Sequence, residues 1–267
     1  MTVELNGVEE LGSATDGAAE AGDDFRPVKS AARVLEVLEV LATDGPLTLR
    51  DVAAHLQVPK SSMHALLRTM QRRGWLETDA TGTLYGLGVR SLLAGSAYVD
   101  SDAVVRRAAP VLDRLAEQTG ETVHLGRLEG GDVVYLAKRE STHPLRLFSS
   151  VGRRLPAHSV ALGKALLAEM APEAALACLP SQLQQMTPKT ITDPALLLDD
   201  LARIRQVGYA VDDEESAADL RCFGVALRQR AGTRDAISIS VPVVRLDDDR
   251  EQEIVALLLQ AGAAFSH

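Results

Sequence analysis

Apolar positions recur at intervals of three and four residues along three short stretches near the N-terminus. The first stretch, Val28 to Leu41, predicts an amphipathic helix. A second helix is predicted from Leu49 to Leu56 and a third from Lys60 to Met70. Pro59 separates them, because proline cannot continue a helix. The pattern therefore predicts a compact three-helix unit whose last two helices form a helix-turn-helix.

Local signals mark the ends of these helices. Thr48 is a suitable N-cap for the second helix, and Asp51 three residues later completes a capping-box pattern. Gly74 is the expected left-handed end of the third helix. Trp75–Thr78 and Thr83–Tyr85 then predict two strands around an Asp-Ala-Thr-Gly turn. A helix-turn-helix followed by a hairpin is typical of winged DNA-binding domains, whose wing can contact the phosphate backbone.

The polar face of the third predicted helix carries small and basic side chains and no acidic residue. Such a face suits a helix that enters the major groove, where arginine can bond guanine. The candidate DNA-binding residues are Thr48, Lys60, Ser61, Ser62, His64, Arg68 and Arg72. We expect Arg68 to read a base and Lys60 to contact phosphate. The alternative for this pattern alone is the solvated face of any small helical hairpin.

Beyond residue 102 the apolar pattern alternates between helical and strand periods. Helices are expected at Val104–Ala116, Val160–Glu169, Glu173–Leu179, Pro194–Val207 and Arg250–Phe265, and strands at Thr122–Leu128, Val133–Lys138, Leu145–Ser149, Tyr209–Asp212, Arg221–Leu227 and Ala236–Val241. Ser159 is the expected cap of the second of these helices. A Glu-Gly-Gly-Asp turn between the first two strands predicts a hairpin. We therefore expect an α+β domain with a mostly antiparallel sheet.

The chain accordingly divides into a disordered acidic tail (1–27), a winged helix-turn-helix domain (28–90), a linker helix (91–101) and a second domain (102–267). The net charge of −9 is unevenly distributed along it. The tail holds seven acidic residues and one basic residue, whereas residues 28–90 hold eight basic and six acidic residues. The winged segment is therefore net basic, which favours contact with phosphate in a chain that is acidic as a whole.

Simpler features exclude several classes of protein. No apolar run approaches the ~18 residues of a membrane span, and the first residues lack the basic region and apolar run of a secretory signal. The two cysteines, Cys178 and Cys222, make neither a disulfide framework nor a zinc site. We therefore expect a cytoplasmic protein with no membrane contact, no metal and no cofactor.

Other candidate groups each have a structural interpretation, which we favour. The run from Asp212 to Glu215 has the residues of a metal site but is more typical of a solvated loop. His124 and His158 are expected to be hydrogen-bonded structural residues. Gly163-Lys164 is not a phosphate-binding loop, because His158 stands where that motif needs glycine and Ala165 replaces its Ser or Thr. No catalytic nucleophile or acid–base pair is evident.

Seven short motifs occur in one order along the chain. They are Pro46–Leu49, Pro59–His64, Thr119–Leu125, Val151–His158, Leu162–Leu167, Thr190–Asp193 and Gly208–Glu215. In their residues and in their order along the chain they resemble the motifs of the IclR family of bacterial transcriptional regulators. The resemblance implies a winged helix-turn-helix, a linker helix, a GAF-like effector-binding domain, and a homodimer or tetramer.

The resemblance also implies a small-molecule pocket in the C-terminal domain. Matched by motif, its effector-binding residues are Ala161, Leu162, Asp212, Cys222, Ser238, Ile239 and Ser240. Free N–H groups at the helix start near Ser159 can hold a carboxylate, and Ser238 and Ser240 point to one sheet face. We expect a small carboxylate whose hydroxyl donates to Asp212, which favours a hydroxy or keto acid over a dicarboxylate. The alternative for the two serines is hydrogen bonding within the sheet.

The chain departs from the family pattern beside this pocket. Where many members have a glycine before an Arg-Cys pair, it has Ala218-Asp219-Leu220, and where Gly-Pro is common it has Val241-Pro242. We expect Val241 to narrow the approach to the backbone, and Asp219 to add charge if it faces inward. Both positions bear on which ligand is bound.

The expected function is a ligand-responsive transcriptional regulator that represses a neighbouring catabolic operon. Its expected partners are a double-stranded DNA operator, a small carboxylate effector and further copies of the chain. The alternative is a metabolic enzyme acting on a small carboxylate, fused to a winged-helix module. The lack of a catalytic or cofactor motif argues against that alternative.

Overall fold

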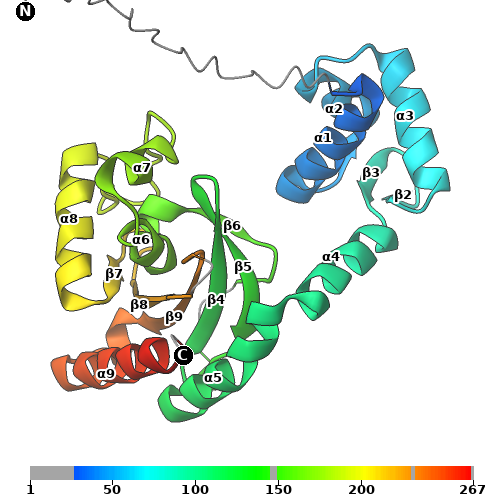
Figure 1. The fold of residues 1–267 in the computed structure, drawn as a ribbon. Helices are drawn as coiled ribbons and strands as arrows, with labels where there is room; N and C mark the ends of the chain where they lie inside the picture. Colours follow the sequence, from blue (N-terminus) through cyan, green and yellow to red (C-terminus); the bar gives the residue numbers. More distant parts are fainter. Residues whose placement is uncertain (1–26, 145–148, 230–231, 266–267) are drawn as a thin grey trace, which may run out of the picture. The chain divides into compact units, whose positions relative to one another are not determined.

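A computed structural model describes residues 27–144, 149–229 and 232–265, which form two compact units divided between Leu93 and Ala94. We describe each unit by itself (Figure 1). The expected acidic tail falls almost entirely on residues 1–26, outside the described ranges, and so does the expected strand at 145–149 apart from Ser149.

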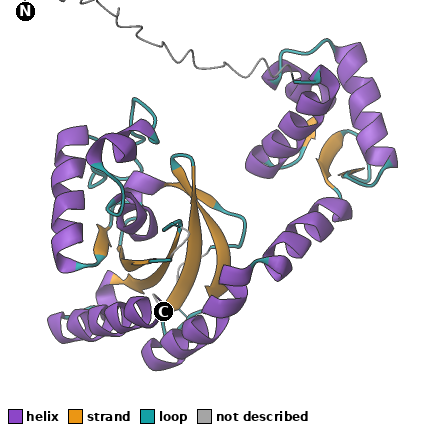
Figure 2. Ribbon diagram, in the orientation of Figure 1, coloured by secondary structure: helices purple, strands orange, loops and turns teal. Residues whose placement is uncertain are grey.

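The first unit is a winged helix-turn-helix. Its helices are α1 (Lys29–Asp44), α2 (Leu49–His55) and α3 (Lys60–Arg72), and its strands are β1 (Leu47–Thr48), β2 (Leu76–Thr78) and β3 (Leu84–Leu87). The predicted hairpin pairs β2 with β3 (Figure 2). Strand β1, which was not predicted, pairs antiparallel with β3 on its other side. It spans two residues, too few for an alternating pattern to be visible in the sequence.

The core of this unit comes from the apolar stripes of the three helices. Val37, Val52, Met63 and Leu67 are inaccessible to solvent. Each fully buried side chain of this size contributes about 1.5–3 kcal/mol of transfer free energy. Helix α3 ends as predicted at Gly74, whose φ of 74° is the left-handed conformation that glycine adopts without steric cost.

The predicted N-cap of α2 is also confirmed. The Thr48 hydroxyl oxygen accepts a hydrogen bond from the Asp51 N–H at 3.2 Å. The reciprocal half differs from a capping box, because the Asp51 carboxylate accepts from the Thr48 hydroxyl at 2.7 Å and not from the Thr48 N–H.

The predicted linker helix is α4, which spans Val89–Ser101 and starts two residues earlier than expected. Its start is tied to the segment between α3 and β2, because the Trp75 carbonyl accepts from the Gly88 N–H at 2.7 Å and from the Ser91 hydroxyl at 3.2 Å. None of the residues of α4 is buried. The helix is therefore anchored at its start, and its apolar side chains remain in solvent.

The second unit is built on one antiparallel sheet. Its described strands are β4 (Thr122–Glu129), β5 (Asp132–Arg139), β6 (Arg154–Pro156), β7 (Ala210–Asp213), β8 (Leu220–Leu227) and β9 (Asp235–Pro242), in the order β6-β5-β4-β9-β8-β7. Helices α5 (Ala103–Thr119) and α9 (Asp248–Phe265) cover one face (Figure 1). Helices α6 (Ala161–Leu167), α7 (Pro172–Ala177) and α8 (Pro194–Val207) contribute to the core on the other face. The predicted α+β class is confirmed.

Strand alternation sorts the side chains of β9 between two cores. Ile237, Ile239 and Val241 belong to the core under α5 and α9, whereas Ala236 belongs to the core under α6. Successive side chains of a strand point to opposite faces, so Ser238 and Ser240 lie on the α6 face. Among the described helices, none is long and apolar enough to cross a membrane.

The chain entering α6 differs from the prediction. A short 3-10 turn (Ala157–Ser159) precedes α6, whose N-cap position is Val160 without a side-chain cap. Ser159 is therefore not the cap, and its hydroxyl donates to the Pro156 carbonyl at 3.0 Å. Helix α6 is seven residues long, shorter than the predicted Val160–Glu169, because the chain turns after Leu167.

Candidate DNA interface and effector pocket

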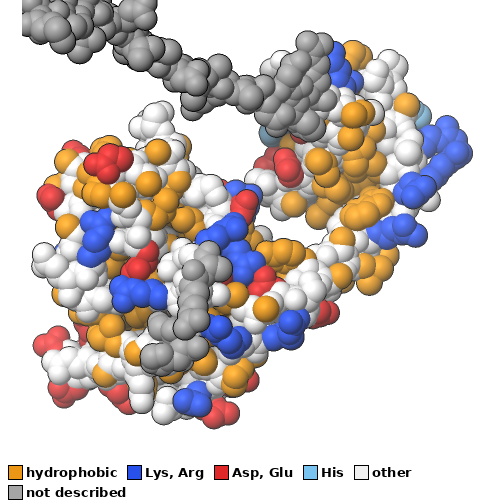
Figure 3. Space-filling model, viewed as in Figure 1, with side chains coloured by type: hydrophobic (Ala, Val, Ile, Leu, Met, Phe, Trp, Pro, Cys, Tyr) orange, Lys and Arg blue, Asp and Glu red, His pale blue; other side chains and the backbone are white. Residues whose placement is uncertain are grey.

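The DNA-binding candidates of α3 form an exposed surface. Lys60, Ser61, Ser62, His64, Arg68 and Arg72 are all exposed, whereas Met63, Leu67 and Met70 are buried. At roughly 100° per residue, Ser61, Arg68 and Arg72 fall within an arc of about 40°. Ser62 lies roughly 120° from Arg68, on the flank of the helix. Lys and Arg side chains gather along one side of this unit in Figure 3.

Thr48 differs from the other DNA-binding candidates. It is half-buried, lies in β1 and uses its hydroxyl to cap α2. The structure therefore gives Thr48 a structural role, at a distance along the chain from the α3 surface.

The wing turn is held by a single carboxylate. The Oδ1 atom of Asp79 accepts the N–H groups of Thr83 and Leu84, each at 2.8 Å, and Oδ2 accepts the Thr81 hydroxyl. The Thr81 hydroxyl first, and then the backbone N–H of Leu84, hold the pKa of Asp79 at about 2. The turn from Asp79 to Thr83 contains no lysine or arginine. Any phosphate contact by this turn must therefore use hydroxyl or N–H groups.

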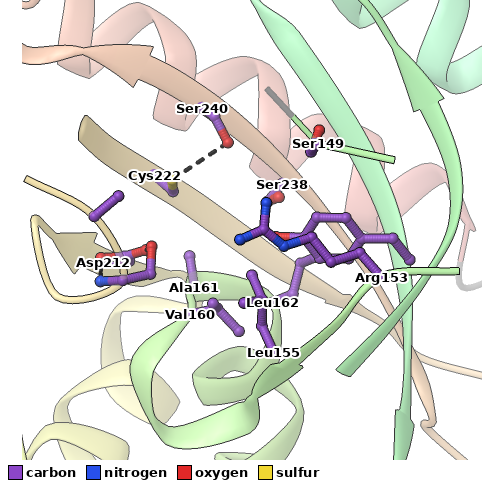
Figure 4. A pocket seen from close by; sticks show the side chains of 13 residues that line it. Ser149, Arg153, Leu155, Val160, Ala161, Leu162, Asp212, Cys222, Ser238 and Ser240 are labelled. Atoms are coloured by element: carbon purple, nitrogen blue, oxygen red, sulfur yellow. Dashed lines mark hydrogen bonds between the residues drawn. The ribbon is translucent and has the colours of Figure 1, made fainter. Parts of the chain in front are cut away.

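A small cavity lies between α6 and the sheet of the second unit (Figure 4). Its volume is about 30 Å³, enough for roughly two water molecules. It is lined by Tyr135, Ser149, Arg153, Leu155, Val160, Ala161, Leu162, Asp212, Ser216, Ala217, Cys222, Ser238 and Ser240. Six of the seven candidate effector residues are thus brought together. Ile239 is the exception and does not line the cavity, because its side chain packs in the core under α5 and α9.

Gly224 on β8 brings the start of α6 onto the sheet. A Cβ at this position would lie 2.8 Å from the carbonyl carbon and oxygen of Ala161, closer than real side chains approach. Gly224 pairs with Ser238 on β9. This close approach places Ala161 and Leu162 above the serines. The short length of α6 leaves little helix dipole for an anion, so the expected carboxylate site at the helix start loses most of its support.

Cys222 and Ser240 are cross-strand partners on β8 and β9. The Cys222 thiol donates to the Ser240 hydroxyl oxygen, with 3.2 Å between Sγ and Oγ. Burial raises the pKa of the Cys222 thiol well above its usual value, so the thiol stays protonated and can donate. Because Ser240 accepts this bond, its own proton remains available to a molecule in the cavity.

The acidic run is not the solvated loop expected from its sequence, because Asp212 and Glu215 are buried. Asp212 Oδ1 accepts the N–H groups of Glu215 and Ser216 at 2.8 and 3.1 Å, and Oδ2 accepts the Ser216 hydroxyl at 2.5 Å. The buried Lys164 pairs with Glu215 and lies 2.9 Å from Asp200. Burial is the first cause that raises the pKa of Asp212. Because the oxygens of Asp212 accept these hydrogen bonds within the turn, they have less capacity to accept a hydrogen bond from a ligand.

His124 and His158 are buried and hydrogen-bonded. His124 Nε2 lies 2.7 Å from the Ser149 hydroxyl oxygen, and His158 Nε2 donates to the Gln184 carbonyl at 2.9 Å. Burial, followed by the charge of Lys138, lowers the pKa of His124 to about 3. Within the described ranges, no cluster of His, Cys, Asp or Glu suits a metal ion.

The two departures from the family pattern lie away from the cavity. Asp219 is exposed, and Val241 is buried in the core under α5 and α9. Neither is among the lining residues, so the expected narrowing by Val241 and added charge from Asp219 do not occur there. The lining residues that sequence reasoning missed include Tyr135, Ser149 and Arg153. Side chains two residues apart in a strand lie on the same face, so Arg153 shares the face of the apolar Leu155. This alternation is the signal in the sequence that indicates Arg153.

Comparison with known proteins agrees with this architecture. Residues 30–80 match the IclR helix-turn-helix domain, and residues 96–267 match the bacterial transcriptional regulator IclR C-terminal domain. The HTH-type transcriptional regulator BhcR of Paracoccus denitrificans is 35% identical over 246 residues, covering 91% of this chain and 88% of that protein. The transcriptional repressor IclR of Escherichia coli is 33% identical over 240 residues, covering 88% of each.

A solved structure is similar over nearly the whole chain. It is an IclR homologue of Microbacterium hydrocarbonoxydans complexed with 4-hydroxybenzoate, with a TM-score of 0.74 and 25% identity over 89% of this chain and 97% of that one. The winged unit, the six-stranded sheet and both family matches lead to one conclusion. This chain belongs to the IclR family and is a DNA-binding transcriptional regulator.

Proposed function

We propose that the protein binds an operator through α3, responds to a small carboxylate in the cavity of its C-terminal unit, and represses a neighbouring catabolic operon. The observation that carries this proposal is the convergence of Ala161, Leu162, Asp212, Cys222, Ser238 and Ser240 on one cavity. A relative named as a repressor and another complexed with 4-hydroxybenzoate support it. The protein acts in the cytoplasm, where its DNA is.

The cavity favours a small acid with one negative charge. The Ser240 hydroxyl can donate to a carboxylate oxygen, and the side chain of Ser238 shares its face. Asp212 on the same lining would repel a second carboxylate. A hydroxy or keto monocarboxylate therefore fits better than a dicarboxylate, and the small volume favours short acids.

The lining supports binding and not turnover. The Cys222 thiol has a raised pKa and is therefore a weak nucleophile. The carboxylate of Asp212 is occupied by three hydrogen bonds within its own turn, so it is poorly placed to act as a base. We infer that the acid acts as a signal and leaves unchanged.

Helix α4 is the proposed surface for dimer formation, and the C-terminal units then pair dimers into tetramers. Val89, Leu92 and Leu93 expose 63%, 67% and 63% of their surface. A second copy packed on this helix would remove these side chains from water. Two winged domains would then read two half-sites, which a single small domain cannot do. Light scattering of Leu92→Glu should show monomer at micromolar concentration. Leu196→Glu, at a 60% exposed leucine of α8, is the control and should stay oligomeric.

The experiment that tests the function starts from a pool of random-sequence duplex DNA. The full-length protein should enrich an inverted repeat, and the affinity for that repeat should change when two- or three-carbon hydroxy or keto acids are added. Failure to enrich any sequence would contradict the proposed operator binding. Enrichment without a response to any acid would contradict the proposed ligand class.

A further inference from the structure

We infer that Arg153 is the residue that selects a carboxylate in this cavity, with its guanidinium binding the acid group opposite Asp212. This inference rests on the proposed function, since it names the group that recognises the charge of the ligand. Among the described residues that line the cavity, Arg153 is the one with a positive charge.

The backbone of Arg153 is fixed against β5. The Tyr135 N–H donates to the Arg153 carbonyl at 2.9 Å, the Gly152 N–H donates to the Tyr135 carbonyl at 2.8 Å, and the Arg153 N–H donates to the Ser150 carbonyl at 3.2 Å. These bonds hold the residue directly before β6, opposite Tyr135, which also lines the cavity. The sheet therefore fixes the backbone from which this side chain extends.

Alternation along the strand decides where this side chain points. Arg153 and Leu155 line the cavity, whereas Arg154 between them points away and binds the Asp132 carboxylate at 3.1 Å. Figure 4 shows the guanidinium end of Arg153 directed inward among the labelled side chains, with Asp212 on the opposite side. Two adjacent arginines thus have different surroundings, one facing the cavity and one facing an acid outside it.

Two other basic side chains lie near the cavity but do not line it. The pKa of His124 is lowered to about 3, so this histidine is neutral at pH 7 and carries no charge toward a ligand. Lys164 is paired with Glu215 and Asp200 and does not line the cavity. A carboxylate that enters the cavity therefore meets its positive partner at Arg153.

The chemistry of arginine suits this role. Its planar guanidinium offers two parallel N–H donors that match the two oxygens of a carboxylate. The other end of the acid, which carries the hydroxyl or keto group, then lies toward Asp212.

The test compares acids with their neutral amides on the full-length protein. Isothermal titration would use glycolate and lactate, each beside its amide. The wild-type protein should bind at least one acid and should bind the matching amide more weakly. Arg153→Gln should weaken binding of that acid about 10- to 100-fold and leave binding of the amide nearly unchanged. Arg153→Lys keeps the positive charge but loses the two parallel N–H donors. Its affinity for the acid should therefore lie between those of the wild-type protein and Arg153→Gln.

Arg154→Gln is the matched control, because it removes the same charge from the neighbouring position outside the cavity. It should bind the acid like the wild-type protein. Equal losses in Arg153→Gln and Arg154→Gln, or no loss in either, would overturn the assignment while leaving the proposed function intact. A wild-type protein that binds no acid, or binds amides as tightly as acids, would overturn the proposed ligand class and this assignment with it.

Discussion

The hydroxyl oxygen of Tyr98, near the end of α4, accepts a hydrogen bond from Arg127 Nη1 at 2.8 Å. The same guanidinium lies 2.6 Å from Asp102 and 2.7 Å from Asp235. Asp102 is the N-cap of α5, and Asp235 begins β9, the strand of Ser238. One side chain therefore joins the end of the linker helix to the strand that lines the cavity.

This arrangement predicts a large stability loss for Arg127→Met. The variant would leave Asp102 and Asp235, whose side chains are 12% and 4% exposed, without their cation. Breaking a buried pair in this way should lower the free energy of unfolding by about 3–5 kcal/mol. Urea unfolding at pH 7, followed by circular dichroism, measures the change.

Tyr98→Phe is the control for this prediction. It removes one partly exposed hydrogen bond and retains both ion pairs, so it should cost about 1 kcal/mol or less. If Arg127→Met cost no more than Tyr98→Phe, the two ion pairs would not stabilise the unit as described.

His124 predicts a pH dependence of stability. The pKa of His124 is lowered from 6.5 to about 3, and burial is the largest cause of this shift. As pH falls below 6.5 the unfolded chain takes up a proton at this residue, and the folded chain does not until about pH 3. Stability that is present above pH 6.5 is therefore lost on acidification, by up to about 1.4 kcal/mol per pH unit.

The variant His124→Gln isolates this contribution, since other groups titrate in both proteins. Between pH 6.5 and 4.5 its unfolding free energy should fall less steeply than that of the wild-type protein. Parallel slopes in the two proteins would show that His124 titrates in the folded state near its ordinary pKa.

The sequence predicted the elements with strong periodicity and missed those held by tertiary contacts. The stripe of α3 was visible because one face of the helix is buried. The alternation of β9 was visible because isoleucines alternate with serines, although both faces of this strand are buried. Strands β1 and β6 have two and three residues and depend on pairing with β3 and β5. Neither could be found from a local pattern.

The cavity was predicted in part, for a similar reason. Motif matching found the residues on α6, β8 and β9, but it also included Ile239, which alternation alone assigns to the other face. The run at Asp212 looked solvated because its sequence shows four acids and not the buried Lys164 that meets one of them. Arg153 was missed because its role depends on the position of Tyr135 across the sheet.

The exposed face of α3 predicts the effect of Arg68→Ala on DNA recognition. Arg68 is exposed and lies beside Ser61 on the outer arc of the helix. Loss of one base contact should weaken binding to the selected operator by about 1–3 kcal/mol and relax preference at the contacted base. Fluorescence anisotropy with the operator and with single-base variants measures both effects. An unchanged operator affinity would contradict the assignment of this face.

Lys60→Ala is the contrasting variant. Lys60 is expected to contact phosphate, so its loss should weaken binding to all DNA sequences. It should also reduce the slope of log affinity against log salt concentration by about one. A change in base preference without a change in salt slope would contradict this role.

The most direct test of the account is the DNA affinity of Ser240→Ala measured with and without a bound acid. In the wild-type protein an acid that binds the cavity should change the operator affinity by about 5- to 150-fold. Ser240 accepts from Cys222 and can donate to the acid, so the alanine variant should keep the ligand-free affinity and lose the response. A variant that responds to the acid like the wild-type protein would contradict the claim that this cavity controls DNA binding.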